Sequence, residues 1–524
     1  MTSATSRPAE PVEADADRAL TPVRHPNLLS FFILSGVIMQ VLDATIANVA
    51  LPHMQAALGA TPESVSWVLT SYIIASAMMI PASGWLADRF GARHLFLGSV
   101  ALFIASSVLC GLAANLPQMV IFRTLQGIGG ASLAPLGQAT MLNINRPSQQ
   151  PQALATYGVG VTLGPVIGPL LGGWLTENFD WRWIFLINVP LGLVCLGGLA
   201  VLMPRIEGPR RPFDLAGWLM IACALAAFQL LLDRGEHNDW FNATESWIEA
   251  GVAVSTFWMF CVHSALSRRP LFPPALLTDR NLVMGSVFQF SMSVVQYATM
   301  ALLPTMMQTL LGYPVLGTGE ILSTRGVAIV SSMWLAGRLV RRVSAPTLLF
   351  LGLAAMAYSL WEMTGWNLEM STSVILVNGM VQGFSMGFIY LPLSVILFST
   401  LPGHLRTDAA GLINLVRNTG GSIGIAVASV MLARNLQTSH SDLAAHITPY
   451  NLAADPSLLN GFGSIGQDVM AMADGMITRQ ATMIAFLDDF QLMFLLSLAI
   501  LPMVLFARRG ARLRPGERIE IAHE

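Results

Sequence analysis

The chain has 524 residues, of which 54% are hydrophobic and only 11% are charged, and its mean hydropathy is +0.60. Because a soluble globular domain carries about 25% charged residues, this composition indicates a protein that crosses a membrane many times. The formal net charge of -2 gives no basis for nucleic-acid binding. The four cysteines lie in apolar runs at spacings that suit neither a disulfide framework nor a metal site.

Residues 1–27 are rich in Pro, Glu, Asp, Ala and Arg, and they predict a disordered cytoplasmic tail with no cleavable signal sequence. Apolar runs of the length that crosses a bilayer, about 20 residues, follow one another from there. They predict an all-α fold with fourteen transmembrane helices. The expected spans lie near 28–50, 65–83, 95–114, 117–140, 152–175, 183–203, 214–232, 247–267, 282–309, 317–337, 346–362, 373–397, 407–433 and 489–507.

Arginine is concentrated in alternate segments between these spans. If the N-terminus is inside, the inner segments hold most of the arginines, including Arg89, Arg93, Arg146 and Arg338, whereas the outer segments hold few. The positive-inside rule then places both chain termini in the cytoplasm. This arrangement requires an even number of spans.

Two segments of the chain resemble each other. GWLADRFGARHLFLG (84–98) follows the second span, and GRLVRRVSAPTLLFLG (337–352) follows the tenth. They are farther apart than six spans with their loops require, so spans 7 and 8 are interpreted as an insertion. The predicted architecture is a six-helix bundle at 28–204, a two-helix linker at 205–280, a second six-helix bundle at 281–507 with an external loop at 434–488, and a cytoplasmic tail at 508–524.

Several sequence blocks distributed over most of these spans carry a family resemblance. They are LDATIANVALP (42–52), GWLADRFGARH (84–94), IFRTLQGIGGA (121–131), GVGVTLGPVIGPLLGG (158–173), WRWIFLINVPLG (181–192) and RTDAAGLINLVRNTGGSIGIA (406–426). Together they resemble the fourteen-span drug:proton antiporters of the EmrB/QacA type, multidrug efflux permeases within the major facilitator superfamily. Such transporters consist of parallel repeats with the substrate site at their interface.

The resemblance implies a non-enzymatic protein of the bacterial inner membrane. It would exchange protons for amphipathic or cationic drugs and toxic compounds by alternating access between the two sides of the membrane. Two other readings stay open: a narrow-range exporter of an endogenous metabolite or siderophore on the same scaffold, and a receptor-like relative that transports nothing. No cofactor is expected. The sequence has no phosphate-binding Gly-Lys-Ser/Thr loop, so a proton gradient is the simplest energy source.

Asp43 is the only acidic residue deep within the spans of the first half. An unpaired carboxylate in lipid is costly and tends to take up a proton, which makes Asp43 a candidate proton-coupling residue. The alternative is a carboxylate that is permanently paired and holds helices together. Arg123 and Gln126 lie on one helix face, and Asp43 or a backbone carbonyl is the expected partner of Arg123. The resemblance implies that Arg123 takes part in proton transfer, whereas the alternative is a structural tether.

The loop after the second span is a candidate gate. Its motif residues are Gly84, Asp88, Arg89, Gly91 and Arg93. A carboxylate near a helix N-terminus is favoured by the helix dipole and can pair with an arginine across the inner gate. The resemblance implies a latch that stabilises the outward-open state, and the alternative is a turn with positive-inside charge. Arg341 stands where the second copy would need the aspartate, so the latch is expected on one side only.

The glycine-rich block at 158–173 predicts close helix packing. Its small residues recur at intervals of four, which lets the fifth span approach a neighbour, and its prolines allow a bend. The resemblance implies an antiporter motif typical of exporters; close packing without directional meaning is the alternative. The motif residues are Gly158, Gly164, Pro165, Gly168 and Gly172.

Polar stripes on lipid-embedded helices usually face a bundle interior or a cavity. Methionine and aromatic side chains around them suit apolar ligands, although they could also fill the core. The residues expected to line a substrate cavity are Gln40, Gln126, Gln289, Ser293, Gln296, Asn378, Gln382, Asn414 and Arg417. Spacing assigns no role to Arg325 or Glu320.

The segment at 434–488 is much longer than the other outer loops. It predicts short amphipathic helices, and a disordered loop is the alternative. The resemblance implies that this segment contacts a periplasmic adaptor, a membrane fusion protein, which leads to an outer-membrane channel. The other expected partners are a small-molecule substrate, protons and membrane lipid.

Overall fold

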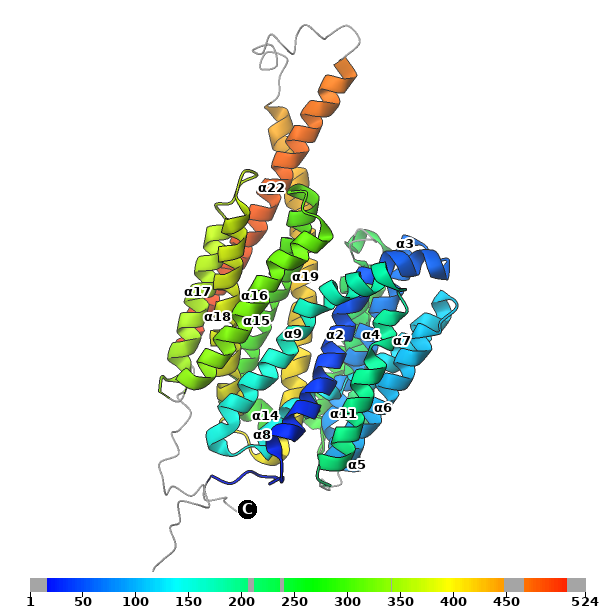
Figure 1. Cartoon of the computed structure of the whole chain (residues 1–524), viewed down its shortest axis with the longest axis vertical. Helices are drawn as coiled ribbons and strands as arrows, with labels where there is room; N and C mark the ends of the chain where they lie inside the picture. Colours follow the sequence, from blue (N-terminus) through cyan, green and yellow to red (C-terminus); the bar gives the residue numbers. More distant parts are fainter. Residues whose placement is uncertain (1–16, 206–211, 236–239, 341, 447–465, 507–524) are drawn as a thin grey trace, which may run out of the picture.

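The computed structural model describes residues 17–205, 212–235, 240–340, 342–446 and 466–506. Arg341, the first part of the predicted N-terminal tail and the tail at 508–524 lie outside these residues. Long α-helices make up almost all of the described chain, which contains no strand (Figure 1). The prediction of an all-α membrane protein is therefore confirmed.

The first half of the molecule comprises residues 17–205. Its helical segments are α2 (Pro26–Leu58), α3 (Pro62–Val65), α4 (Trp67–Met79), η1 (Ile80–Ala82), α5 (Ser83–Phe90), α6 (Ala92–Gly111), α7 (Leu116–Gly130), α8 (Leu133–Ile144), η2 (Pro147–Gln149), α9 (Gln150–Asn178), α10 (Trp183–Leu186) and α11 (Asn188–Leu202). The expected fourth span is interrupted after Gly130, so that it consists of α7 and α8 rather than one helix.

The linker and the second half follow. The linker contains α12 (Leu215–Arg234), η3 (Trp240–Asn242) and α13 (Thr244–Leu266). The second half, residues 274–506, contains α14 (Pro274–Thr278), α15 (Arg280–Thr305), the π-helical turn η4 (Met306–Leu310), α16 (Val315–Leu339), α17 (Ala345–Met363), α18 (Thr372–Phe398), η5 (Gly403–Leu405), α19 (Arg406–Ala445), α22 (Gly466–Ile500) and η6 (Leu501–Phe506).

Local sequence explains where several helices begin and end. The side chains of Asn115, Asp214 and Asp279 accept backbone hydrogen bonds at the first turns of α7, α12 and α15. Gly91 has a φ of +82° in the turn between α5 and α6. Residues with a Cβ atom rarely adopt this backbone conformation. The chain can therefore turn sharply between these two helices.

Twelve described helical segments are long and apolar enough to cross a membrane. The expected fourth and tenth spans correspond to α7–α8 and α16, which are helical but are not among these twelve. A multi-pass membrane protein is thus established, whereas fourteen spans and the proposed domain limits stay predictions.

The molecule has two ends, which differ in the segments they carry. The proximal face is the end at which α2 begins, and it carries the turn at Gly91 and the start of α19. The distal face is the opposite end, from which α19 and α22 project as a long hairpin (Figure 1). On the proximal face Asp17 accepts hydrogen bonds from the hydroxyl and the amide of Ser148, and these bonds hold the pKa of that carboxyl below its usual value.

The distal hairpin corrects one prediction. The described parts of 434–488 form no short separate helices; they continue α19 and α22 beyond the rest of the bundle, and residues 447–465 lie outside the described chain. His440 and Asp474 meet at 3.1 Å between the two arms. For the described parts the prediction was wrong, because polar residues in this segment resemble a loop, whereas two packed helices can tolerate them at exposed positions.

The two halves contact each other through a few helices. Helix α9 packs on α2 within the first half and on α16 and α18 of the second half, while α19 packs on α8 and α5. Helix α12 of the linker packs on α4 and contacts α19. The helix that carries the glycine-rich block therefore lies between Asp43 on α2 and the second half of the molecule.

Candidate functional site

Asp43 and Arg123 form an ion pair in the interior of the first half. The Oδ2 atom of Asp43 on α2 lies 2.7 Å from Nη1 of Arg123 on α7, and both side chains are 0% exposed. Two opposite charges at this distance offset much of each other's desolvation cost, although a pair in a nonpolar interior needs further hydrogen bonds to be tolerated. The structure supplies those bonds from α7 itself and from two more helices, α4 and α11.

Asp43 also receives two amide hydrogen bonds. Its Oδ1 atom accepts from Gln126 at 2.9 Å and from Asn188 at 2.7 Å, and both donors are completely buried. The hydroxyl of Ser107 on α6 accepts from the same two amides, at 2.7 and 3.0 Å. The carboxylate is thus held by groups from α7 and α11, and α6 supports both of these groups.

Arg123 is held by more than its carboxylate partner. Its Nε donates to the carbonyl of Val68 on α4 at 3.0 Å, and its Nη1 donates to Gln126 at 2.8 Å. Its guanidinium carbon lies 4.5 Å from the ring centre of Tyr72 and 5.4 Å from that of Phe185. Cation–π contacts of this kind stabilise a desolvated guanidinium. Among described atoms, Nη2 of Arg123 has no hydrogen-bond partner, so the cation keeps one donor for another acceptor.

The sequence offered two partners for Arg123, and the structure contains both: Asp43 and the carbonyl of Val68. Gln126 was expected to line a cavity, but it lies inside the Asp43 network. Asn188 and Ser107 were not singled out. Asn188 stands within the WRWIFLINVPLG block as an amide among apolar residues, and this was the signal that could have identified it.

The glycine-rich block brings α9 against the helix that carries Asp43. A Cβ atom built on Gly164 would lie 2.6 Å from Val41, one on Gly168 would lie 2.2 Å from Oγ1 of Thr45, and one on Gly172 would lie 2.7 Å from Ile46. The hydroxyl of Thr45 donates to the carbonyl of Gly164 at 3.2 Å. The expected close packing is present, with α2 as the neighbour.

The same helix meets the second half on another face. A Cβ on Gly158 would lie 2.8 Å from Sδ of Met333 on α16, and a Cβ on Gly326 of α16 would lie 2.5 Å from Val166. Pro165 and Pro169 lie within α9, which stays helical through both positions. Helix α9 therefore contacts both α2 and α16 closely.

The gate motif meets the second half at Gly84. A Cβ on Gly84 would lie 1.6 Å from Oδ1 of Asp408, which is in the first turn of α19. Asp408 lies within the sequence block at 406–426, and it supplies the carboxylate near a helix N-terminus at this contact. Asp88 and Arg89 lie in the last turns of α5 before Gly91.

Arg93 does not cross the gate. Its Nη1 donates to the carbonyl of Met203 at 2.8 Å, and its Nη2 donates to the carbonyl of Ala200. Both carbonyls belong to the end of α11 in the same half, where an arginine satisfies free carbonyl groups and complements the helix dipole. Arg93 therefore ties α6 to α11 instead of pairing across the two halves.

The other expected cavity residues divide into two groups. Asn378 is buried between α17 and α18, where it bonds to Ser359 and Glu362, and both amide atoms of Gln382 are buried without a hydrogen-bond partner among the described atoms. Gln289 donates to Ser293 on the same helix, and both are buried. These four residues lie within the second half.

The second group of expected cavity residues is Gln40, Gln296, Asn414 and Arg417. Three of these are partly exposed, and the buried Asn414 is bonded to the partly exposed Arg417. Gln296 accepts a hydrogen bond from Tyr390 of α18, and Arg417 donates to Asn414 of the same helix. Gln40 lies on α2, one turn before Asp43, and is partly exposed. Gln296, Asn414 and Arg417 thus gather on α15 and α19, which pack against each other.

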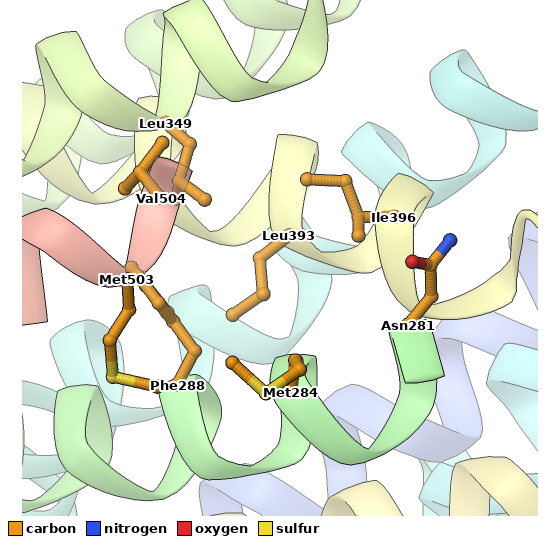
Figure 2. A pocket seen from close by; sticks show the side chains of 9 residues that line it. Asn281, Met284, Phe288, Leu349, Leu393, Ile396, Met503 and Val504 are labelled. Atoms are coloured by element: carbon orange, nitrogen blue, oxygen red, sulfur yellow. The ribbon is translucent and has the colours of Figure 1, made fainter. Parts of the chain in front are cut away.

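A pocket in the second half lies elsewhere. Figure 2 shows its apolar walls, to which Phe288 and Leu393 contribute from α15 and α18, and Met503 from η6. None of the residues expected to line a substrate cavity lines this pocket. It lies on the proximal side of the second half, and no residue of the Asp43 network lines it.

The helical architecture and the buried ion pair occur in a chain that matches a known protein family over most of its length. The sequence model of the family described as Major Facilitator Superfamily matches residues 33–425. This chain belongs to the major facilitator superfamily. As a member of that superfamily it is a transporter and not an enzyme, and the family resemblance inferred from its sequence blocks is confirmed.

Curated relatives of this major facilitator protein are similar over nearly their whole length. The chain is 32% identical to the multidrug export protein EmrB of Haemophilus influenzae over 92% of this chain and 95% of that protein. It is 32% identical to the fatty acid resistance protein FarB of Neisseria gonorrhoeae, over 90% and 94%. It is 31% identical to EmrB of Escherichia coli K12, over 92% and 95%.

Solved structures agree on the fold. The human organic anion transporter MFSD10 superposes with a TM-score of 0.59 at 15% identity, covering 90% of this chain and 99% of the other. The proton:xylose symporter XylE superposes with a TM-score of 0.57 at 13% identity, covering 91% and 96%. At these identities the likeness establishes a major facilitator fold and nothing about the substrate.

Proposed function

We propose that this protein exports amphipathic compounds in exchange for protons by alternating access, as a multidrug efflux permease. The observation that carries the proposal is the completely buried ion pair of Asp43 with Arg123, which joins α2 to α7. An intramembrane carboxylate paired with an arginine is costly to maintain for packing alone, since well-packed apolar residues often stabilise an interior equally well. The names of the relatives, multidrug export and fatty acid resistance, support export.

The proposed coupling begins with proton uptake by Asp43. A neutral carboxyl no longer attracts the guanidinium of Arg123, which can turn toward another acceptor with its free Nη2 donor. This change loosens α2 relative to α7. Because α2 packs closely on the glycines of α9 and α9 packs on α16, the shift passes to the contact between the two halves.

The proposed orientation places the proximal face in the cytoplasm of a bacterium, with the protein in the inner membrane and both termini inside. The support is the arginine content of the proximal turns, which include Arg89, Arg93 and Arg338. The contacts of Gly84 with Asp408 and of Arg406 with Asn143 then close the cytoplasmic side. Gly84, Asp88, Arg89 and Gly91 act in this proposal as the latch of that closed state.

The distal hairpin is the proposed contact for a periplasmic adaptor protein and, through it, for an outer-membrane channel. The support is its projection beyond the other distal loops (Figure 1). The test replaces residues 437–477 with a short Gly/Ser linker and measures adaptor co-purification and export from cells. We expect loss of both, with transport in vesicles retained. Retained co-purification and cellular export would contradict this contact.

The proposed function is tested by transport in proteoliposomes. Purified protein is reconstituted, a pH gradient is imposed, and a panel of amphipathic compounds with anionic, neutral and cationic headgroups is supplied. We expect accumulation against a concentration gradient that collapses when a protonophore is added. A panel in which only one metabolite moves would favour the narrow-range exporter, and movement of no compound would favour a receptor-like relative.

A further inference from the structure

Two arginines lie in the middle of second-half helices that meet the first half. Arg325 on α16 is 6% exposed; its Nη2 lies 3.8 Å from Sδ of Met386. Arg417 on α19 is partly exposed and donates a hydrogen bond to Asn414. Neither guanidinium has a carboxylate within ion-pair distance in the described part of the chain. Two cations thus stand inside the membrane region without the partner that Arg123 has.

Acidic residues are scarce on the four helices that carry Arg325, Arg417 and Tyr390 or pack directly beside them. Helices α15 and α18 contain no Asp or Glu. On α16 the acidic residue is Glu320, which is exposed toward the distal end, and on α19 the acidic residues are Asp408 in the first turn and Asp442 near the end. In the first half, Asp43 is already bonded to Arg123. The middle parts of α15, α16, α18 and α19 therefore carry two arginines and no acidic residue. The buried Asp489 is on α22, which packs on α19 and α15.

Tyr390 on α18 links the two arginines into one site. Tyr390 lies one turn after Met386, which contacts Arg325, and its hydroxyl donates to Gln296 on α15. The next residue of α15, Tyr297, lies against Gly421, which is one turn after Arg417 on α19. Because α9 packs on α16 and α18, this group of residues lies next to the first half of the molecule.

Apolar and polarisable side chains lie along the helices that carry the arginines. Met386 contacts Arg325, and Met333, two turns farther along α16, lies at the contact of α16 with Gly158 of α9. The ring of Tyr297 lies 3.0 Å from the position of a Cβ on Gly421. Methionine and aromatic surfaces adapt to apolar ligands of different shapes. The site thus combines a cationic centre with apolar flanks.

We propose that the exported compounds are amphipathic organic anions, whose acidic headgroup binds Arg325 and Arg417 beside Tyr390 while the apolar part contacts the flanking methionines and aromatic residues. This inference rests on the proposed function and narrows its substrate class, which the sequence alone left as amphipathic or cationic. Guanidinium groups bind carboxylate and sulfonate oxygens in a bidentate manner. Two of them in a region of low dielectric would repel a cationic headgroup.

The charge balance of the cycle follows from this assignment. One proton that enters and one monovalent anion that leaves together move two positive charges inward. An inside-negative membrane potential therefore drives the exchange in addition to the pH gradient. A monovalent cation exchanged for one proton would move no net charge, and the potential would have no effect on it.

The test compares two probes that share one ring system. Full-length protein in nanodiscs is titrated with 1-pyrenesulfonate and with 1-pyrenemethylammonium, and binding is followed by energy transfer from tryptophan. We expect at least tenfold tighter binding of the sulfonate. Arg325→Gln and Arg417→Gln should each weaken sulfonate binding at least tenfold, and Arg325→Lys should lose less than Arg325→Gln.

Arg338→Gln is the matched control, because Arg338 is an exposed arginine at the end of the same helix, stacked on Trp334. It should bind both probes as the unmodified protein does. Equal or tighter binding of the ammonium, or unchanged sulfonate binding in Arg325→Gln and Arg417→Gln, would overturn the anion assignment.

Vesicle transport separates this inference from the proposed function. Export of pyrenemethylammonium driven by protons, without export of the sulfonate, leaves proton-coupled export standing and overturns the anion site. Arginine-dependent binding of the sulfonate with no response of transport to the pH gradient supports the anion site and contradicts proton coupling. Sulfonate export that depends on the pH gradient and is stimulated further by an inside-negative potential supports both.

Discussion

Gly84 on α5 lies directly against Asp408 on α19, and a Cβ on Gly84 would fall 1.6 Å from the carboxylate oxygen and 3.3 Å from the Cα atom of Asp408. Helices from different halves therefore meet at a point where a side chain larger than hydrogen does not fit. This contact belongs to the proximal face, where Arg406 also bonds to Asn143. A larger residue here should act on the closure of that face.

We expect Gly84→Val to open the proximal face, because steric overlap of this kind costs about 1–3 kcal/mol. A cost of that size shifts a two-state equilibrium about fivefold or more. The measurement is the labelling rate of a cysteine placed at Ala155, which faces Gly337 across the two halves. Gly98→Val is the control, since a Cβ there meets nothing within 4 Å. Equal labelling of both variants would show that the contact does not hold the face closed.

The packing of α9 on α2 gives a second prediction. Gly168→Ala should lower the thermal midpoint and reduce export at least tenfold, because the new Cβ would lie 2.2 Å from Oγ1 of Thr45. Gly173→Ala should change little, since its Cβ would lie 3.9 Å from Val49. Adding Thr45→Ala to Gly168→Ala removes the nearest atom and should restore part of both losses. A double variant no better than Gly168→Ala would contradict this explanation.

Asn188 should matter for coupling although it carries no charge. Asn188→Ala removes the hydrogen bonds to Asp43 and Ser107, and we expect a roughly tenfold loss of gradient-driven export, since a bond to a charged group contributes about 1.5–3 kcal/mol. Asn178→Ala is the control, because Asn178 is exposed and bonds to a carbonyl of its own helix. The readout is the initial rate of export under a fixed pH gradient. An unchanged rate in Asn188→Ala would remove Asn188 from the coupling network.

Asp489 on α22 gives a prediction about stability. It is 1% exposed, and neither carboxyl oxygen has a hydrogen-bond partner among the described atoms. A buried polar group without a partner costs about 1–3 kcal/mol, so Asp489→Leu should raise the thermal midpoint in detergent. Asp488→Leu should change it less, because Asp488 is exposed. A lower midpoint for Asp489→Leu would mean that the carboxyl stabilises the fold.

The sequence predicted the helices well because hydropathy and length determine spans in lipid almost independently of tertiary contacts. It also predicted Asp43 as a possible partner of Arg123 and the close approach at Gly168, since charges and small residues within apolar runs are usually there for pairing or for close packing. It did not predict that Gln126 bonds to Asp43 or that Asn378 bonds to Ser359 and Glu362, because a polar face on a helix does not reveal which neighbour it meets. The contact of Asp408 with Gly84 was not predicted, because it joins segments more than three hundred residues apart.

The distal hairpin shows another limit of sequence patterns. Helices α19 and α22 extend past the apolar runs as one continuous pair, and His440 with Asp474 links the arms. Hydropathy marks where lipid ends but not where a helix ends. Packing of the two arms against each other determines where the two helices end.

Proton coupling through Asp43 is the central claim, and Asp43→Asn tests it most directly. The amide keeps the size of the side chain and removes its charge, and a thermal midpoint within a few degrees of the unmodified protein would show that the fold is intact. In proteoliposomes we expect this variant to retain exchange of labelled for unlabelled substrate at equal concentrations, and to lose accumulation driven by a pH gradient. Full gradient-driven accumulation in Asp43→Asn would contradict proton coupling through this carboxylate.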